Sequence, residues 1–225
     1  MKEAAIIYED NHLIAVNKPA GFLVQGDQTG DETILDVLKQ FIKTTYNKPG
    51  EVFLAPNHML DRPVCGALLF SKTSKALGRV NTLFQKNLVE KVYYAICEGI
   101  PQELEGKLVN HIAKNRQKNI SFVSSPGKNG SKECVLTYKV LKIINQKSLI
   151  EVRPQTGRPH QIRAQLSHIG VPILGDLKYG AQKKMEDRSI ALHCKSLQFE
   201  HPVRREPVLI EADVPNLSVW RIYFE

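Results

Sequence analysis

Short apolar segments with the pattern of β-strands recur along most of this 225-residue chain, and only three segments show a helical period. Strand-like runs open the chain in AAIIYEDNHLIAVN, around a turn at 9–12, and they return repeatedly after residue 88. They do not alternate strictly with helices, as the strands of parallel α/β sheets do. The sequence therefore predicts an α+β protein with a large mixed or antiparallel sheet.

Three segments repeat apolar residues every three or four positions, which is the period of an amphipathic helix. They lie within residues 33–50, 73–84 and 156–170. Each begins near a side chain that can accept a hydrogen bond from the first free N–H groups of a helix. These expected caps are Asp31 or Thr33, Thr73 or Ser74, and Thr156. Each helix should bury its apolar face in the core.

The remaining apolar runs have the length and pattern of strands. They are ALLF at 67–70, LVEKVYYAICEG, CVLTYKVLKII, SLIEVRP, IALHCKSLQF, PVLIEADV and VWRIYF. A polar turn at 145–147 should join CVLTYKVLKII and SLIEVRP as an antiparallel pair. Residues 114–132 contain Ser, Gly and Asn throughout, so we expect a mobile loop there.

Length and composition limit the class of protein. The chain suits one large domain or two packed lobes. No apolar run approaches the ~20 residues that span a bilayer, and the first residues do not resemble a signal peptide. The four cysteines lie far apart, without the short spacings of a zinc site. We therefore expect a cytoplasmic protein with reduced thiols and no membrane partner; disulfides are the alternative.

The charge of the chain favours a nucleic-acid partner. Thirty-one Lys and Arg against 23 Asp and Glu give a net charge of +8 and a pI near 9.3. The first 60 residues are acidic, with 5 bases and 8 acids, and the rest is strongly basic. Residues 114–132 hold five bases and no acid, so this segment is either an RNA-backbone contact or a solvated surface loop.

A single carboxylate, Asp61, stands in the stretch HMLDRPVCGALLFSKTSKA. Its aliphatic neighbours make a poorly hydrated setting, where a carboxylate is costly unless a cation pairs with it. Arg163 is the expected partner, because it lies beside Ile162 on the apolar stripe of the third helix. The alternative is that Asp61 only orders a turn with Pro63 and Gly66.

The segment RPQTGRPHQIR crowds three arginines and a histidine at the start of the third helix. A phosphate or carboxylate would be favoured there by the helix N-terminus and by the guanidinium groups. The same residues could be surface cations near an ordinary helix cap. Our candidates for RNA-backbone contacts are Arg158, His160, Lys114, Arg116 and Lys118.

Tyr93 and Tyr94 should point to opposite faces of their strand. One ring is then expected in the core and the other at a cleft or in water. A ring at a cleft can stack on a base, although packing alone would also explain both residues.

Other enzyme motifs are absent from the sequence, including GxGxxG, a Walker loop, GxSxG and HExxH. The seven histidines show no metal-ligand spacing. Helix capping and a solvated face explain the acids between 27 and 36 better than a metal does. We therefore expect no metal site.

In order along the chain, five segments resemble the RluA-like family of pseudouridine synthases. They are IIYEDNHLIAVNKPAGFLV, HMLDRPVCGALLFSKTSKA, EKVYYAICEG, RPQTGRPHQIRAQLSHIGVPILGDLKYG and IALHCKSLQFEHP. The resemblance covers nearly the whole chain. It implies a cofactor-free and metal-free enzyme that isomerises uridine to pseudouridine in ribosomal or transfer RNA. The fold it implies is a mixed sheet in two lobes, flanked by helices, around a basic cleft.

The resemblance also implies roles for single residues. Asp61 takes the catalytic position, Tyr93 is the ring against the target uracil, Arg163 is the ion-pair partner of Asp61, and Leu192 is an apolar wall. Asp61 could act as nucleophile or as general base, and the sequence leaves both open. The target nucleotide is expected to flip out of the folded RNA.

The chain departs from the family pattern close to Asp61. Met59 stands where the family has an Arg that helps to occupy the place of the flipped base, and Val64-Cys65 stand for Thr-Ser. Arg62 is the candidate to compensate for that Arg. Gln165 stands where a His is common, which we interpret as a structural variation.

We expect residues 1–225 to form one catalytic domain, without the small N-terminal RNA-binding domain, and to act as a monomer. An alternative is an RNA-binding or assembly factor that keeps the fold and has lost turnover through the changes near Asp61. A metal-dependent nuclease would need clustered carboxylates, and the sequence has none near Asp61.

Overall fold

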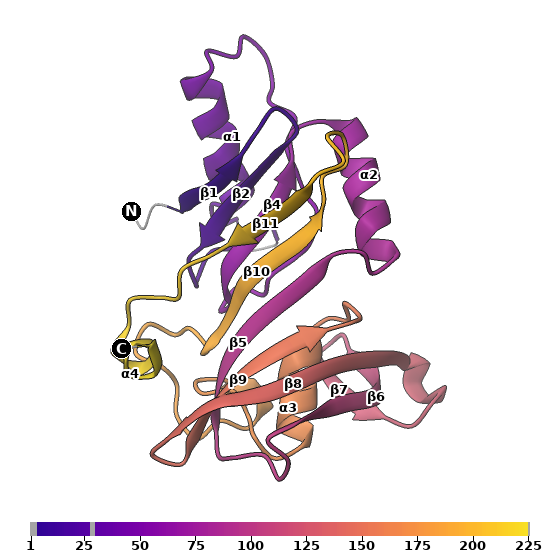
Figure 1. Cartoon of the computed structure of the whole chain (residues 1–225), viewed down its shortest axis with the longest axis vertical. Helices are drawn as coiled ribbons and strands as arrows, with labels where there is room; N and C mark the ends of the chain where they lie inside the picture. Colours follow the sequence, from indigo (N-terminus) through magenta and orange to yellow (C-terminus); the bar gives the residue numbers. More distant parts are fainter. Residues whose placement is uncertain (1–3, 28–29, 225) are drawn as a thin grey trace. The chain divides into compact units, whose positions relative to one another are not determined.

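The computed structural model describes residues 4–27 and 30–224, and the chain divides into two compact units. The first unit consists of Met1–Glu90 and Cys194–Val214, and the second of Lys91–His193 and Pro215–Glu225. Figure 1 shows the elements of both units along the chain. The α+β class and the two lobes expected from the sequence are confirmed.

The first unit contains strands from both ends of the sequence. Its strands are β1 (Ala5–Glu9), β2 (Leu13–Lys18), β3 (Ala55–Pro56), β4 (Cys65–Ser71), β10 (Leu192–Glu200, which belongs to this unit from Cys194 on) and β11 (Pro207–Glu211). They follow the order β1-β2-β4-β10-β11, and the short β3 pairs with β4. Strands β1 and β2, β2 and β4, and β10 and β11 pair antiparallel. Every residue of β4 is buried, so this strand lies in the core.

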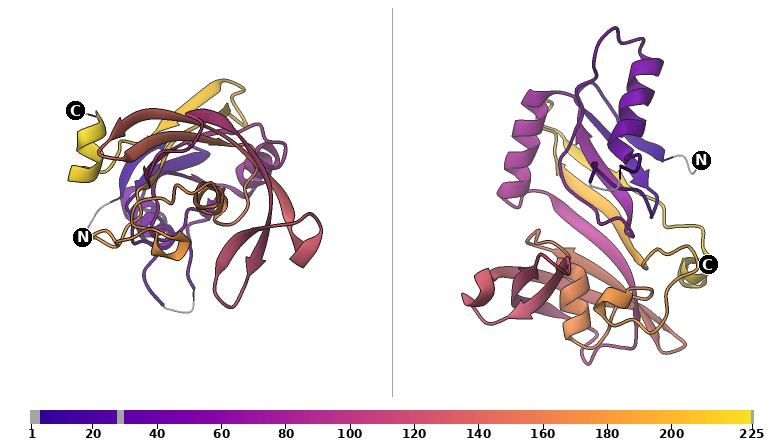
Figure 2. Two further views of the ribbon diagram at one scale, coloured as in Figure 1. Left: turned by 90° about the horizontal axis from the view of Figure 1, so that it is seen from below. Right: turned by 180° about the vertical axis from the view of Figure 1, so that it is seen from behind.

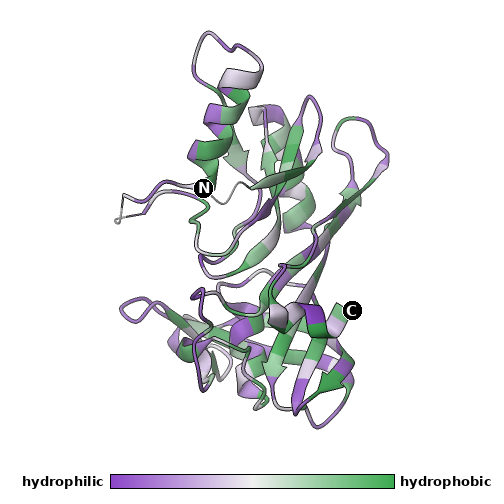
Figure 3. Ribbon diagram, turned by 90° about the vertical axis from the view of Figure 1, so that its left-hand side faces the viewer, coloured by the Kyte–Doolittle hydropathy of each residue, from purple (hydrophilic) through white to green (hydrophobic). Residues whose placement is uncertain are grey.

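Two helices flank the strands of the first unit, α1 (Ile34–Thr45) and α2 (Ser74–Gln85) (Figure 2). Thr33 and Asp36 form a capping box at the start of α1, which satisfies two N–H groups that a helix end leaves open. Thr73 caps α2 through the N–H of Ala76. Apolar and polar residues alternate along α1, as Figure 3 shows, and its buried residues recur at the helical period.

The second unit is built on five antiparallel strands in the order β5-β9-β8-β6-β7. Their bounds are β5 (Glu90–Glu98), β6 (Glu105–Asn115), β7 (Ile120–Ser124), β8 (Lys132–Ile144) and β9 (Lys147–Pro154). The helices are α3 (Gln161–His168), α4 (Ser218–Phe224) and the short 3-10 turns η1 (Lys128–Gly130) and η2 (Leu177–Tyr179). Helix α3 contacts β6, β7 and η2 (Figure 1).

The segment 114–132 is not a loop throughout, because its first residues end β6 and residues 120–124 form β7. Strand β6 was missed by the sequence analysis, and β7 pairs with it through residues 111–115 and 120–124. Ile120 and Val123 of β7 pack against a buried cluster that includes Ile112 and Tyr179. These apolar contacts hold the segment as a hairpin, in spite of its Ser, Gly and Asn content.

Two further expectations about local structure were wrong. The segment VWRIYF forms helix α4 and not a strand, because Trp220 and Tyr223 lie three residues apart on one helix face and are both buried. Thr156 does not cap α3. Its hydroxyl donates to the side chain of Gln161 and accepts from the N–H of Val135, while His160 takes the cap position with a left-handed backbone (φ 53°).

Candidate active site

Asp61 lies in a tight turn directly before the buried strand β4. Its backbone carbonyl accepts a hydrogen bond from the N–H of Val64 at 3.0 Å. The neighbours Leu60 and Val64 are buried, and Asp61 itself is half-buried. The turn that we weighed as an alternative is therefore present, and buried apolar residues flank Asp61 in the chain.

A buried lysine, Lys18, is hydrogen-bonded to this turn. The ammonium group of Lys18 donates to the carbonyl oxygens of Pro19, Phe22 and Arg62 at 3.1, 3.0 and 3.3 Å. Burial lowers the pKa of Lys18 from its ordinary value to about 8, although the nearby Cys65 and Asp61 act in the opposite direction. Lys18 therefore ties the loop after β2 to the residue that follows Asp61.

Arg62 is held in the same loop by its side chain. Its Nη2 pairs with Asp31 at 2.8 Å, and its Nε donates to the carbonyl of Gly21 at 2.9 Å. The side chains of this pair are each 47% exposed, so it is a surface ion pair of modest strength. Met59, on the other side of Asp61, is 58% exposed. An apolar side chain thus reaches solvent two residues before the carboxylate.

A close backbone contact fixes the strand that follows the turn. Gly66, the second residue of β4, has φ +114°, a conformation that residues with a side chain rarely adopt. A Cβ added there would collide with the carbonyl oxygen of Cys194 in β10 and lie 2.5 Å from its nitrogen. Only glycine allows β10 to approach β4 this closely.

In the second unit, the guanidinium group of Arg163 lies in a buried polar pocket of α3 and η2. Its Nε and Nη2 donate to the two carboxylate oxygens of Asp176 at 2.6 and 2.8 Å. Its carbon Cζ lies 4.8 Å from the ring centroid of Tyr179. The sequence analysis named Arg163 and missed Asp176, whose position after the helix gave no local sign of this contact.

Tyr179 connects this pocket to two other elements. Its hydroxyl accepts from the N–H of Ser121 in β7 and is hydrogen-bonded to Nδ1 of His160, both at 2.8 Å. Its carbonyl accepts from the hydroxyl of Ser167 at 2.6 Å. His160 therefore has an internal partner in addition to its place near the helix start.

The two adjacent tyrosines of β5 separate as predicted. Tyr93 is buried and pairs with Val152 of β9 in the strand register. Tyr94 lies on the other face and packs on Phe224 of α4, with ring centroids 5.5 Å apart. Leu192, at the start of β10, is also buried. The side chains of Tyr93 and Leu192 are thus largely shielded from water.

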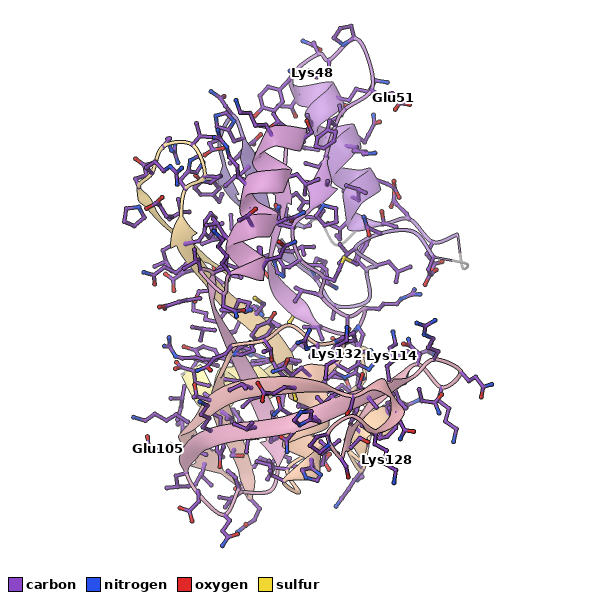
Figure 4. The ribbon with its side chains drawn as sticks, turned by 90° about the vertical axis from the view of Figure 1, so that its right-hand side faces the viewer. Lys48, Glu51, Glu105, Lys114, Lys128 and Lys132 are labelled. Carbon is purple, nitrogen blue, oxygen red and sulfur yellow. The ribbon has the colours of Figure 1, made fainter. Side chains whose placement is uncertain are left out.

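The cationic residues of the segment 114–132 gather at one end of the second unit's strands. Lys114, Arg116 and Lys118 are exposed on the β6–β7 hairpin. Lys132 of β8 lies beside this hairpin through its register with β6, and η1, which carries Lys128, contacts β6 as well (Figure 4). We call these five residues the hairpin cations.

Arg158 differs from the hairpin cations because its side chain is partly engaged. It is half-buried, and its Nε donates to the carbonyl of Glu133 at 3.1 Å. Its N–H donates to the side-chain oxygen of Gln161 at 3.0 Å. These contacts fix the loop before α3, so Arg158 is a less accessible cation than the exposed lysines of the hairpin.

Asp61, Met59 and Arg62 belong to the first unit, whereas Tyr93, Arg163 and Leu192 belong to the second. The pairing of Asp61 with Arg163 stays a prediction.

Within residues 4–27 and 30–224, no three His, Cys, Asp or Glu side chains form a group that could hold a metal ion. The thiols of the four cysteines are reduced and buried. None of the helices in the described part of the chain has the length and apolar character to cross a membrane.

Comparisons of the sequence and of the structure with known proteins all point to one family. A family model described as RNA pseudouridylate synthase matches residues 12–168. The chain is 34% identical over 219 residues to ribosomal large subunit pseudouridine synthase C of Rickettsia prowazekii (96% of this chain, 70% of the relative). It is 30% identical over 240 residues to tRNA pseudouridine synthase C of Vibrio parahaemolyticus (99% and 94%). The solved structure of human RNA Pseudouridylate Synthase Domain Containing 4 aligns with a TM-score of 0.81 at 25% identity (97% and 92%).

Proposed function

Because this chain belongs to the RNA pseudouridylate synthase family and isomerises uridine in RNA, we propose that Asp61 is its catalytic carboxylate. The observation that supports this assignment most directly is the setting of Asp61. It is a half-buried acid between the buried residues Leu60 and Val64, at the head of a strand without exposed residues. Such a setting concentrates a negative charge beside an apolar surface that can receive a base.

The reaction needs a group of this kind and no cofactor. The bond from ribose C1′ to uracil N1 breaks, the base turns, and a new bond forms between C1′ and C5. The hydrogen on C5 leaves as a proton, and N1 takes up a proton, so the isomerisation involves no oxidant or reductant. A carboxylate beside the sugar can attack C1′ as a nucleophile or remove a proton as a general base. Both roles for Asp61 stay open.

We propose roles in the reaction for three residues of the second unit as well. Arg163 would supply the cation that pairs with Asp61, as the family resemblance implies. Tyr93 supplies a ring for the detached uracil, and Leu192 an apolar wall. The burial of Tyr93, Arg163 and Leu192 supports these roles, because a loosened base must be held away from water.

The family has an Arg at the position of Met59, and that Arg helps to fill the gap left by the flipped nucleotide. We assign the same role to Met59. Its exposure supports this assignment, since an apolar side chain can insert between bases where the usual Arg would form hydrogen bonds. Arg62 is engaged with Asp31 and Gly21, so it can take part only if the exposed pair with Asp31 opens.

The substrate that we propose is ribosomal or transfer RNA in the cytoplasm, bound by one copy of the chain. The relatives named above act, by their names, on the large ribosomal subunit and on tRNA. Backbone contacts would come first from Lys114, Arg116 and Lys118, whose exposure on the hairpin supports this role. Arg158 and His160 would contribute less, because each has a partner inside the protein.

The experiment that tests this proposal maps pseudouridine in total cellular RNA with and without the gene. We expect one or more sites to disappear in the deletion strain, to return with the wild-type gene, and not to return with Asp61→Asn. That pattern would identify the target RNA and the catalytic acid together. A site fully restored by Asp61→Asn would reject the assignment of Asp61. An unchanged set of sites, with RNA binding retained, would favour an assembly role.

A further inference from the structure

Arg163 is held from two sides by the segment that follows α3. Asp176 occupies two of its three nitrogens, Nε and Nη2, in parallel hydrogen bonds of 2.6 and 2.8 Å. The side chains of the two residues are only 6% and 2% exposed. The ring of Tyr179 covers the guanidinium group at 4.8 Å. Two hydrogen bonds and a stacked ring determine both the plane and the direction of the group.

Tyr179 is itself locked in place. Its hydroxyl bonds to the N–H of Ser121 and to the ring of His160, and its carbonyl to the hydroxyl of Ser167. These three partners come from β7, from the loop before α3 and from the end of α3. The backbone N–H of Tyr179 also donates to the carbonyl of Asp176 at 2.9 Å, so a backbone hydrogen bond joins the two residues in one turn.

Stability alone is a weak reason for this arrangement. A buried ion pair loses the hydration of both charges, and apolar residues of similar volume often stabilise a protein as well. A charged pair that is buried, bidentate and stacked is instead what a fixed orientation requires. The arrangement leaves Nη1 as the guanidinium nitrogen outside the pair with Asp176.

We propose that Asp176 and Tyr179 are positioning residues, which fix the plane and the direction of the Arg163 guanidinium group for its part in the reaction. This inference rests on the proposed function, because it assumes that Arg163 is the partner of Asp61. Neither Asp176 nor Tyr179 contacts the RNA in this proposal. Their effect on the reaction passes entirely through the guanidinium group, and that property can be measured.

The test uses release of tritium from C5 under single-turnover conditions. The probe is total RNA labelled with [5-³H]uridine and isolated from cells that lack the gene, so that the target uridine is unmodified. Varying the enzyme concentration gives the maximal rate and the half-saturating concentration separately. The proteins are the wild type, Asp176→Asn, Arg163→Lys and the double variant. Melting curves and circular dichroism report whether each variant is folded.

We expect Asp176→Asn to lower the maximal rate about tenfold or more and to change the half-saturating concentration less than about threefold. In the Arg163→Lys background, the same change should alter the rate by less than about threefold, because residues that act through one group are not additive. A residue with a structural role alone would lower the rate by a similar factor in both backgrounds.

A second pair of variants covers the case in which Asp176→Asn does not fold. Tyr179→Leu removes the ring over the guanidinium group, whereas Tyr179→Phe keeps it and loses only the hydroxyl contacts. We expect the leucine variant to lose more of the maximal rate than the phenylalanine variant. Folded Asp176→Asn or Tyr179→Leu proteins with a rate within about twofold of the wild type would overturn the inference, and so would additive effects with Arg163→Lys.

The same assay separates this inference from the proposed function. If Asp61→Asn retains the wild-type rate, the assignment of the catalytic acid fails. If Asp61→Asn is inactive while Asp176→Asn and Tyr179→Leu react normally, only the positioning role fails.

Discussion

The ammonium group of Lys18 donates a hydrogen bond to the backbone carbonyl of Arg62, the residue next to Asp61, across 44 positions of sequence. The N–H of Gly21 donates to the same carbonyl at 2.8 Å. The loop after β2 and the turn before β4 are therefore bound together at one oxygen atom. This contact gives a buried lysine a direct part in placing the proposed catalytic acid.

The lowered pKa of Lys18 predicts a specific pH dependence of stability. The folded protein has a pKa of about 8 for this group, below the ordinary value of 10.5, so the unfolded chain binds more protons between these two values. The free energy of unfolding should therefore rise with pH in this window, by up to about 3 kcal/mol from this group. Below pH 8 the burial cost of the ammonium group is present in full.

Urea denaturation of wild type and Lys18→Met at pH values between 7.5 and 10.5 measures this effect. The other titrating groups are common to both proteins, so the difference between the two curves isolates Lys18. We expect the wild-type curve to rise relative to that of the variant. Parallel curves would show that the pKa of Lys18 is not lowered by folding.

Gly66→Ala should destabilise the first unit by about 3 kcal/mol or more, through the strained φ and the collision with the backbone of Cys194. Gly78 in α2 is the matched control, because an added Cβ there meets nothing within 4 Å. Gly78→Ala should stabilise the protein by ~0.5–1 kcal/mol, as alanine does in an exposed helix. Thermal melts of the two variants provide the comparison, and similar melting temperatures would contradict it.

Lys114, Arg116 and Lys118 should account for much of the salt dependence of RNA binding. Each phosphate contact contributes about 0.7–0.9 to the slope of log K against log salt, so the triple alanine variant should lose about 2 from this slope. The control is Lys43, Lys48 and Lys75 changed to alanine, which removes the same charge from exposed sites of the first unit. Filter binding at several salt concentrations tests both. Equal slopes in the two variants would indicate a general charge effect and not a hairpin site.

Tyr93 should act through its ring and not through its hydroxyl. Tyr93→Phe is expected to keep most of the single-turnover rate, and Tyr93→Leu to lose about tenfold, since stacking on a base contributes ~1–3 kcal/mol. Tyr94→Leu is the control, because this ring packs on Phe224 at the other face of β5. It should lower the melting temperature and leave the rate unchanged. A larger rate loss for Tyr94→Leu than for Tyr93→Leu would exclude the proposed role.

Much of the fold could be predicted because its signals are local. The capping pair of Thr33 and Asp36 and the period of the following residues define α1 within a few positions. The prediction of a strand around Trp220 was wrong, because a short run of aromatic and β-branched residues fits a strand and a buried helix equally well. Strand β6 was missed since its buried residues become apparent only when β7 and β8 pair with it.

The site was predictable to a smaller extent. Asp61 and Arg163 stand out by their apolar neighbours, which the sequence displays directly. Lys18 and Asp176 do not, because their importance lies in contacts with distant or irregular segments. A lysine at the end of the apolar strand β2 was nevertheless a signal, since all four residues at 13–16 are buried and Lys18 continues the strand into the core.

The dependence of β4 on β10 has a consequence for synthesis on the ribosome. The strand that follows Asp61 appears early, yet the backbone of Cys194 that covers Gly66 is translated 128 residues later. Contacts of such long sequence separation form slowly and leave an unfinished sheet exposed meanwhile. The nascent chain should therefore hold its first unit open until Cys194 has left the ribosome, which postpones the onset of catalysis until then.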